Sequence, residues 1–211
     1  FLRPVRLQDS LPPATYLKMK ILVFGSNGQI GWQLCRALAP IGDVVSPARY
    51  LQSGISADLT DIHAMRSVTK RIAPDVIVNA AAYTAVDNAE EQPTLAETVN
   101  VTAPGVIAEE AKVLNALFVH YSTDYVFDGA SSEPYPEDAL ANPQSAYGAS
   151  KHAGEQAVLE ESPASSIIVR TSWLYGLHGQ SFPRSILQAG RTRETLDVVT
   201  DQRGQPTWTV E

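Results

Sequence analysis

The sequence of 211 residues predicts an α/β fold, namely a doubly wound parallel sheet with helices on both of its faces. Short apolar runs alternate along the chain with stretches in which apolar residues recur every three or four positions. The runs are apolar almost throughout, which is typical of strands that are buried on both faces. A glycine-rich turn also joins the first apolar run, residues 20–24, to a helical pattern.

The predicted strands are short, and most contain valine or isoleucine. They are residues 20–24, 43–46, 76–78, 117–122, 167–170 and 196–199. The predicted helices are residues 32–38, 61–72, 99–114, 145–161 and 182–190. Asp61 is suited to cap the second helix, and Pro74 lies just beyond its end. A loop rich in proline, glycine and serine is expected over residues 128–144.

Composition restricts the class of protein. With 44% hydrophobic and 18% charged residues, the chain is typical of a folded globular protein. A net charge of -7 and the lack of a basic cluster argue against nucleic acid as a partner. No apolar run approaches the roughly 20 residues of a membrane span, so no membrane partner is expected. The single cysteine, Cys35, cannot form an internal disulfide, which predicts a reducing, cytoplasmic location.

The glycine turn predicts a nucleotide site. Gly25, Gly28 and Gly31 form a G-x-x-G-x-x-G pattern between a strand and a helix. Gly25 permits the tight turn, Gly28 lets the backbone approach a pyrophosphate, and Gly31 lets the helix pack close to the strand. The helix N-terminus then offers free N–H groups to phosphate. The alternative is an ordinary glycine-rich turn, but the strand and helix around it favour a Rossmann-type site.

The type of dinucleotide depends on the segment after the second strand. A site that prefers NAD usually has an acidic residue there, whereas this chain has the sequence SPAR at residues 46–49. Arg49 could bind a 2′-phosphate, which favours NADP; the alternative is a solvated surface arginine. Asp58, followed by Leu59, either faces the adenine or forms a turn.

Two strand ends carry further candidates. Small residues, NAAA at 79–82, follow the third strand and leave room for a flat ligand, with Tyr83 and Thr84 after them. The alternative is close packing of a helix on the sheet. Ser122 and Thr123 end the fourth strand, where a hydroxyl could bind a substrate carbonyl. Because side chains alternate along a strand, at most one of the two is expected to face the substrate, and both could instead be turn formers.

Tyr147 and Lys151 lie four residues apart, on one face of the predicted helix. A phenol normally loses its proton near pH 10, and a neighbouring ammonium would lower that value. Such a phenol can exchange a proton with a carbonyl oxygen near neutral pH. The alternative is a helix face with a solvated lysine. The four histidines are scattered, so no metal site is predicted.

Several motifs in order resemble the extended short-chain dehydrogenase/reductases, which act on nucleotide sugars. They are the glycine loop, NAAA, STDYVF and YGASK. GQIGW, PDVIVNAAAYTAVDNAE, HYSTDYVFDG, YGASKHAGE, RTSWLYG and DQRGQPT are similar to the dTDP-4-dehydrorhamnose reductase family within that group. The resemblance covers residue 19 to about residue 207. It implies that NAD(P)H reduces the 4-keto group of dTDP-4-dehydro-L-rhamnose, the last step of dTDP-rhamnose biosynthesis, which supplies cell-surface polysaccharide.

The resemblance also assigns roles to residues. Tyr147 is implied as the proton donor, and Lys151 lowers its pKa and holds the nicotinamide ribose. Thr123, rather than Ser122, matches the catalytic hydroxyl, and Asp124 and Trp173 match substrate contacts. The positions that match cofactor contacts are Gly28, Gln29, Ile30, Asp58, Leu59, Ala82, Tyr83 and Thr84. Some members of the family need Mg²⁺ or form homodimers, and no residue here is assigned to that ion.

The expected organisation has three parts. Residues 1–18 are predicted to form a tail outside the fold, 19–172 an NAD(P)-binding Rossmann domain, and 173–211 the start of a small substrate-binding subdomain. Members of the family continue for several tens of residues beyond DQRGQPT, so an incomplete, truncated subdomain is expected. One rival function is a non-catalytic regulatory subunit of the methionine adenosyltransferase type. Another is a nucleotide-sugar epimerase or dehydratase.

Overall fold

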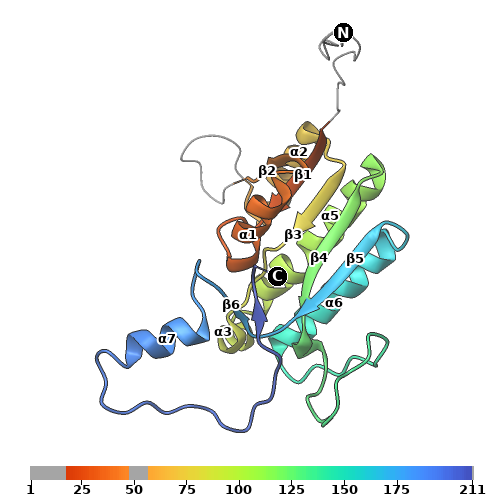
Figure 1. The fold of residues 1–211 in the computed structure, drawn as a ribbon. Helices are drawn as coiled ribbons and strands as arrows, with labels where there is room; N and C mark the ends of the chain where they lie inside the picture. The colour runs from red at the N-terminus through yellow and green to blue at the C-terminus, as the bar shows by residue number, and fades with distance from the viewer. Residues whose placement is uncertain (1–17, 48–56, 211) are drawn as a thin grey trace, which may run out of the picture.

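The computed structural model describes residues 18–47 and 57–210. Its centre is a parallel sheet of five strands in the order β2-β1-β3-β4-β5 (Figure 1). The strands are β1 (Met19–Phe24), β2 (Gly42–Val45), β3 (Val76–Asn79), β4 (Leu117–Thr123) and β5 (Ser166–Thr171). The strand order reverses at β1, since β2 lies on one side of it and β3 on the other. Open α/β sheets bind their ligands beside such a reversal, at the carboxyl ends of the strands.

Helices cover both faces of the sheet, which confirms the predicted doubly wound α/β class. The α-helices of the described residues are α1 (Gln29–Leu38), α2 (Ile62–Ile72), α3 (Val86–Glu91), α4 (Pro93–Glu97), α5 (Ala103–Leu114), α6 (Ala146–Glu161) and α7 (Phe182–Ala189), and α7 extends away from the sheet (Figure 1). On one face, Leu34 and Leu38 of α1 pack on Ile21 and Val23 of β1. On the other, α2, α5 and α6 enclose a larger core. Figure 1 shows α1 in front of the sheet and α5 and α6 behind it.

The helix before β4 is longer than predicted. Helical structure begins at Pro93 and continues through a π-helical turn, Thr98–Thr102, into α5, whereas the sequence indicated a start near residue 99. The π turn ends just before Pro104, so that this proline falls in the first turn of α5, where its missing N–H costs little. The sequence also gave no sign of α3.

The prediction of a strand at residues 196–199 is wrong. These residues have no regular structure, and Val198 and Val199 are exposed. Instead, two short strands, β6 (Leu174–Tyr175) and β7 (Thr207–Trp208), pair in parallel as a separate small sheet. The four residues LDVV have strand propensity but no neighbouring strand among the described residues to bond with, and an unpaired strand has no reason to form.

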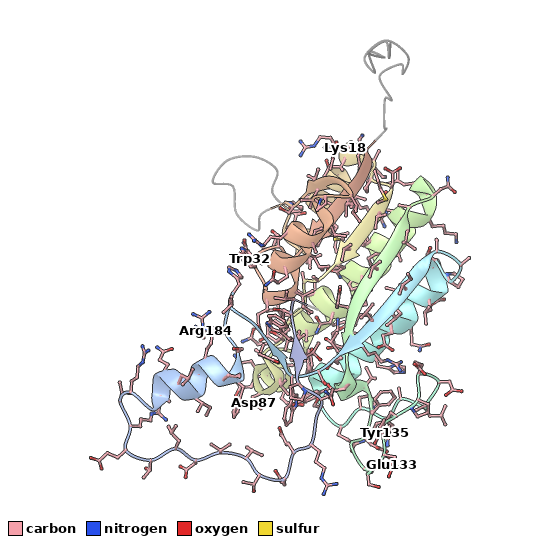
Figure 2. All side chains as sticks on the ribbon, viewed as in Figure 1. Lys18, Trp32, Asp87, Glu133, Tyr135 and Arg184 are labelled. Atoms are coloured by element: carbon pink, nitrogen blue, oxygen red, sulfur yellow. The ribbon has the colours of Figure 1, made fainter. Side chains whose placement is uncertain are left out.

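The segment after β5 is attached to the glycine turn at the start of α1. Trp32 of α1, labelled in Figure 2, stacks on His178 with 4.9 Å between ring centroids. His178 Nε2 lies 3.1 Å from the carbonyl oxygen of Asn27, and Gln29 Nε2 donates to the carbonyl oxygen of Leu174 at 3.5 Å. These contacts place β6 and the loop before α7 beside the first turn of α1.

Helix α6 is placed by two glycines that let other backbone segments come very close. A Cβ at Gly148 would lie 2.2 Å from the carbonyl oxygen of Tyr125. A Cβ at Gly154 would lie 2.0 Å from that of Asn100 in the π turn. Both distances are far shorter than a van der Waals contact, so only glycine fits without movement of the backbone.

We therefore expect Gly154→Ala to lower the free energy of unfolding by about 2 kcal/mol, within the usual range for overpacking a buried site. Gly105→Ala in α5 is the matched control, because its Cβ would meet only the Ala157 side chain, at 3.3 Å. Alanine also favours a helix over glycine by about 1 kcal/mol, so the control should change little. Urea denaturation measures both, and equal losses in the two variants would contradict this account of α6.

Candidate active site

A cavity of about 370 Å³ lies at the carboxyl ends of β3, β4 and β5. One side is formed by the first turn of α1 and the residues after β3, and the other by α6 and the segment after β5. Its lining includes Gln29, Ile30, Ala82, Thr84, Thr123, Asp124, Tyr147, Lys151 and Trp173, all of which the sequence had singled out. The fold thus brings together residues that are up to 144 positions apart, from Gln29 to Trp173.

The glycine turn has the shape that the sequence predicted. Gly25 has a φ of +85°, and a Cβ there would lie 2.6 Å from the backbone nitrogen of Ala81. A Cβ at Gly31 would lie 2.1 Å from the carbonyl oxygen of Gly25, so this glycine does permit close packing. Gly28 is the N-cap of α1, and no side chain caps the helix. The N–H groups of the first turn are therefore available to a phosphate, and this cradle fits a dinucleotide.

The segment near the predicted adenine site has another local role. Asp58 Oδ1 accepts a hydrogen bond from Thr60 N at 3.0 Å, which is the turn that the sequence offered as one alternative. Leu59 is buried and packs in the core between the sheet and α2. Arg49 lies outside the described residues. Cofactor contacts by these three residues remain predictions.

The residues after β3 are held by an asparagine that the sequence analysis missed. Asn100, in the π turn, accepts from Tyr83 N at 2.9 Å and donates to the Tyr83 carbonyl oxygen at 3.1 Å. It also donates to Ser150 Oγ on α6 at 3.0 Å. Ala82 and Thr84 line the cavity, while Tyr83 packs against the apolar cluster that contains Tyr147. A single side chain therefore fixes the edge of the cavity against the helix that carries Tyr147.

The hydroxyl groups of Thr123 and Tyr147 belong to one cluster. Thr123 Oγ1 accepts from Tyr125 N and donates to Asp124 Oδ1, each at 3.2 Å. Burial raises the pKa of the Tyr147 phenol, and a hydrogen bond with Thr123 partly offsets this. The sequence had predicted a lowered pKa through Lys151, and the shift is in the opposite direction. Burial disfavours the phenolate, and Lys151 Nζ is directed to other partners.

Lys151 is buried, with 1% of its surface exposed. The alternative of a helix face with a solvated lysine is therefore wrong. Its Nζ donates to the carbonyl oxygen of Tyr121 at 2.7 Å and lies 3.3 Å from His120 Nε2. Burial lowers the pKa of Lys151 to about 8, although Glu155 acts to raise it. Burial, followed by the charge of Lys151, also lowers the pKa of His120 well below its ordinary value.

Two more residues that the sequence analysis missed fix the orientation of α6. Glu155 accepts from Arg170 Nε at 2.9 Å and from Arg170 Nη2 at 2.6 Å, so that α6 and β5 are joined by a two-point ion pair. Tyr147, Lys151 and Glu155 follow one another at intervals of four residues on one face of α6. The spacing of four residues was a sequence signal from which Glu155 could have been identified.

Trp173 and Asp124 lie at the cavity on the side of the small sheet. Trp173 has a φ of 45°, which is unusual for a bulky residue and is often found at binding sites. Its ring lies over Gly204, where a Cβ would approach within 2.4 Å of Cε2. Burial raises the pKa of Asp124, which is partly offset by its hydrogen bond with Thr123.

The fold and this cavity define a class: a Rossmann-type α/β domain with Thr123, Tyr147 and Lys151 in one cavity at the ends of its parallel strands. A family model described as the RmlD substrate binding domain matches residues 19–211. The chain belongs to this family.

Relatives agree with this assignment. A dTDP-4-dehydrorhamnose reductase of Burkholderia thailandensis is 48% identical over 90% of this chain and 62% of its own length. A dTDP-4-keto-6-deoxy-D-glucose reductase of Streptomyces niveus is 44% identical over 90% of this chain and 65% of its own. The crystal structure of the Bacillus anthracis dTDP-4-dehydrorhamnose reductase in complex with NADP superimposes with a TM-score of 0.84, at 39% identity, over 92% of this chain and 67% of that one. The chain thus spans less than two thirds of the length of the Burkholderia and Streptomyces relatives.

The described residues offer no support for a metal or a membrane span. They contain no group of three or more His, Cys, Asp or Glu side chains placed to hold a metal ion. None of their helices has the length and apolar character needed to cross a membrane.

The buried His120 makes stability depend on pH. An unfolded histidine titrates near 6.5, whereas folded His120 resists protonation, so only the unfolded state takes up this proton as the pH falls. The stability that neutral His120 contributes is complete above pH 6.5 and is lost below it. We expect a fall of up to about 2 kcal/mol in the free energy of unfolding between pH 7 and pH 5.

Urea denaturation at several pH values tests this dependence. His63→Gln, which changes an exposed histidine on α2, should keep the decline. His120→Gln should flatten it. The same slope in both variants would show that another group is responsible.

Proposed function

We propose that this chain carries the catalytic site of a dTDP-4-dehydrorhamnose reductase, which reduces the 4-keto group of dTDP-4-dehydro-L-rhamnose with NADPH or NADH. The observation that carries the proposal is the meeting of Tyr147 and Thr123 in a cavity that adjoins the glycine turn. The names of the Burkholderia and Streptomyces relatives support it, since both are reductases of dTDP-4-keto sugars. The product, dTDP-L-rhamnose, is a precursor of cell-surface polysaccharide.

In the proposed reaction the bound cofactor supplies a hydride to C4 of the sugar. Tyr147 gives its proton to the carbonyl oxygen, and the Thr123 hydroxyl, turned away from Asp124 Oδ1, donates a second hydrogen bond to that oxygen. The raised pKa of Tyr147 suits this direction of reaction, because the phenol holds its proton until the alkoxide develops. Lys151 would hold the nicotinamide ribose.

The cofactor is proposed to lie along the glycine turn, with its pyrophosphate at Gly28, Gln29 and Ile30. The free first turn of α1 supports this placement, and so does the NADP complex of the Bacillus anthracis relative. Ala82, Tyr83 and Thr84 would border the nicotinamide half. Asp124 and Trp173, which line the same cavity, are the proposed contacts of the sugar.

The rival functions have less support. A regulatory subunit would not need Thr123, Tyr147 and Lys151 together in one cavity, and the relatives named above are reductases. The sugar is less restricted, since the Streptomyces niveus relative carries the name of a different keto sugar. A cytoplasmic location, a homodimer and a need for Mg²⁺ remain predictions, and no step is assigned to the metal.

We expect Tyr147→Phe to lower the rate of hydride transfer by 10²- to 10⁴-fold, roughly 3–5 kcal/mol, and to leave cofactor affinity unchanged. Only the hydroxyl is removed, so packing is kept. Lys151→Ala should do similar harm and also weaken cofactor binding, whereas Thr123→Val should cost less. Single-turnover kinetics with dTDP-4-dehydrorhamnose and a separate NADPH titration measure these effects, with Tyr135→Phe in the exposed 128–144 loop as the control. A Tyr147→Phe rate close to that of the wild type would remove this residue from its role.

The cofactor preference is tested through Arg49. Residues 46–49, directly after β2, include no acidic residue. We therefore expect NADPH to be used at least as well as NADH, and Arg49→Ala to reduce kcat/KM for NADPH more than for NADH. Arg71→Ala, on the exposed end of α2, should leave the ratio unchanged. A strong preference for NADH that Arg49→Ala does not alter would refute this part.

A further inference from the structure

A continuous chain of buried hydrogen bonds runs from β3 through β4 to α6, and the reaction described above does not use its middle residue. Asn79 Oδ1 accepts from Ala81 N at 3.1 Å. Asn79 Nδ2 lies 3.2 Å from His120 Nδ1, and His120 Nε2 lies 3.3 Å from Lys151 Nζ. Asn79 and His120 are both 0% exposed.

The direction of each bond follows from its two ends. A backbone N–H can only donate, so Ala81 N requires the oxygen of the Asn79 amide and turns the amide nitrogen toward His120. That nitrogen is also a donor, so His120 Nδ1 must accept and carries no proton. Neutral His120 therefore bears its proton on Nε2, which faces Lys151.

The direction has a consequence for Lys151. A protonated Nε2 is a donor, and an ammonium has no lone pair to accept its hydrogen bond. A neutral amine can accept from His120 Nε2 and still donate to the carbonyl oxygen of Tyr121. Every bond of the chain is therefore satisfied only when Lys151 is uncharged.

We propose that His120, oriented by Asn79, is a positioning residue that stabilises the neutral form of Lys151 and so sets the pH at which this lysine gains and loses its charge. The lowered pKa of Lys151, about 8, agrees with this arrangement, although burial is its main cause. The lowered pKa of His120 agrees as well, because an imidazolium could not accept from Asn79.

Other charged groups near Lys151 act in the opposite direction or are already neutralised. Glu155, one turn later on α6, favours the ammonium, but it is paired with Arg170 of β5. Asp124, beyond β4, acts on Tyr147 through its charge, and its own pKa is raised by burial. Glu90 of α3 accepts from Ala146 N at the start of α6. Among the groups described here, His120 is the titratable side chain that contacts Nζ.

The consequence for catalysis rests on the proposed function. If Lys151 must be charged to hold the ribose and support Tyr147, the reduction should lose rate as the pH rises through about 8. A change in His120 should then move the alkaline limb of the pH–rate profile without moving the acidic one.

The first test concerns the bonds themselves and needs no activity. Nitrogen-15 NMR of histidine-labelled wild-type protein distinguishes the two tautomers and the imidazolium. We expect His120 to carry its proton on Nε2 and to remain neutral from pH 8 down to pH 5. A proton on Nδ1, or an imidazolium at pH 7, would overturn the proposal.

The second test is the pKa of Lys151, measured by carbon-13 NMR of labelled lysine side chains. The chain has only four other lysines, Lys18, Lys20, Lys70 and Lys112, and Lys151→Met identifies the signal in question. Gln can place a carbonyl oxygen where His120 Nε2 lies, so His120→Gln should raise the pKa of Lys151 by about one pH unit. His63→Gln, the same change at an exposed position on α2, should not alter it. An unchanged or lower Lys151 pKa in His120→Gln would refute the proposal.

A second variant keeps the idea testable if His120→Gln fails to fold. Asn79→Asp has nearly the same shape and still accepts from Ala81, but it offers an acceptor to His120. We expect the histidine proton to move to Nδ1 and the Lys151 pKa to rise. A His120 tautomer that is the same in Asn79→Asp as in the wild type would overturn the proposed direction of the hydrogen bonds.

The kinetic arm separates this proposal from the proposed function. In His120→Gln, the alkaline limb of kcat/KM with dTDP-4-dehydrorhamnose should move up by about one pH unit, in step with the NMR titration. A limb that stays in place while the Lys151 pKa moves would show that the lysine charge does not limit the reduction, which overturns the catalytic consequence. A protein without reductase activity, but with the expected His120 tautomer and Lys151 pKa, would refute the proposed function. The proposed hydrogen bonds from Asn79 to Lys151 would remain supported.

Discussion

The close approach of α6 to the ends of the parallel strands is the constraint on which the site depends. The helix can lie so near the π turn and the Tyr125 backbone only because glycine occupies positions 148 and 154. The Glu155–Arg170 ion pair then fixes its rotation relative to β5. Tyr147 and Lys151 lie on the same face as Glu155, so the rotation that forms the ion pair also directs the phenol and the amine toward β4. Packing, rather than attraction between the reactive groups, thus assembles the site.

Burial then gives the site a common electrostatic character. The pKa values of Tyr147 and Asp124 are raised and those of Lys151 and His120 are lowered, and burial is the largest cause in each case. All four groups shift toward their neutral forms, as expected where charges are removed from water. Titratable groups in such a cavity readily stay uncharged. The low polarity around them also strengthens each hydrogen bond made to a developing charge. Specific contacts, such as Thr123 to Tyr147 or Glu155 to Lys151, adjust these values in the opposite direction.

The two sides of the cavity are held together by contacts of a different kind. The stacking of Trp32 on His178 and the contact of His178 with the Asn27 carbonyl join the small sheet region to the glycine turn. A ligand that spans the cavity would meet both at once. Binding of a nucleotide at the first turn of α1 and of a sugar near Trp173 would therefore involve both sides of the cavity, which these contacts join.

The sequence by itself determined the α/β class, the glycine turn and the candidates at the strand ends, because these follow from local patterns. Apolar runs mark buried strands, Gly25 and Gly31 are demanded by backbone geometry, and a spacing of four places Tyr147 and Lys151 on one helix face. Only the tertiary structure decided how those residues behave. The burial of Lys151, its contacts with His120 and Tyr121, and the role of Asn100 involve segments 30 to 50 residues apart. The raised pKa of Tyr147 and the absence of a strand at 196–199 have the same origin. Desolvation and strand pairing are set by what the rest of the chain places around a residue, and neighbours in the sequence do not determine that.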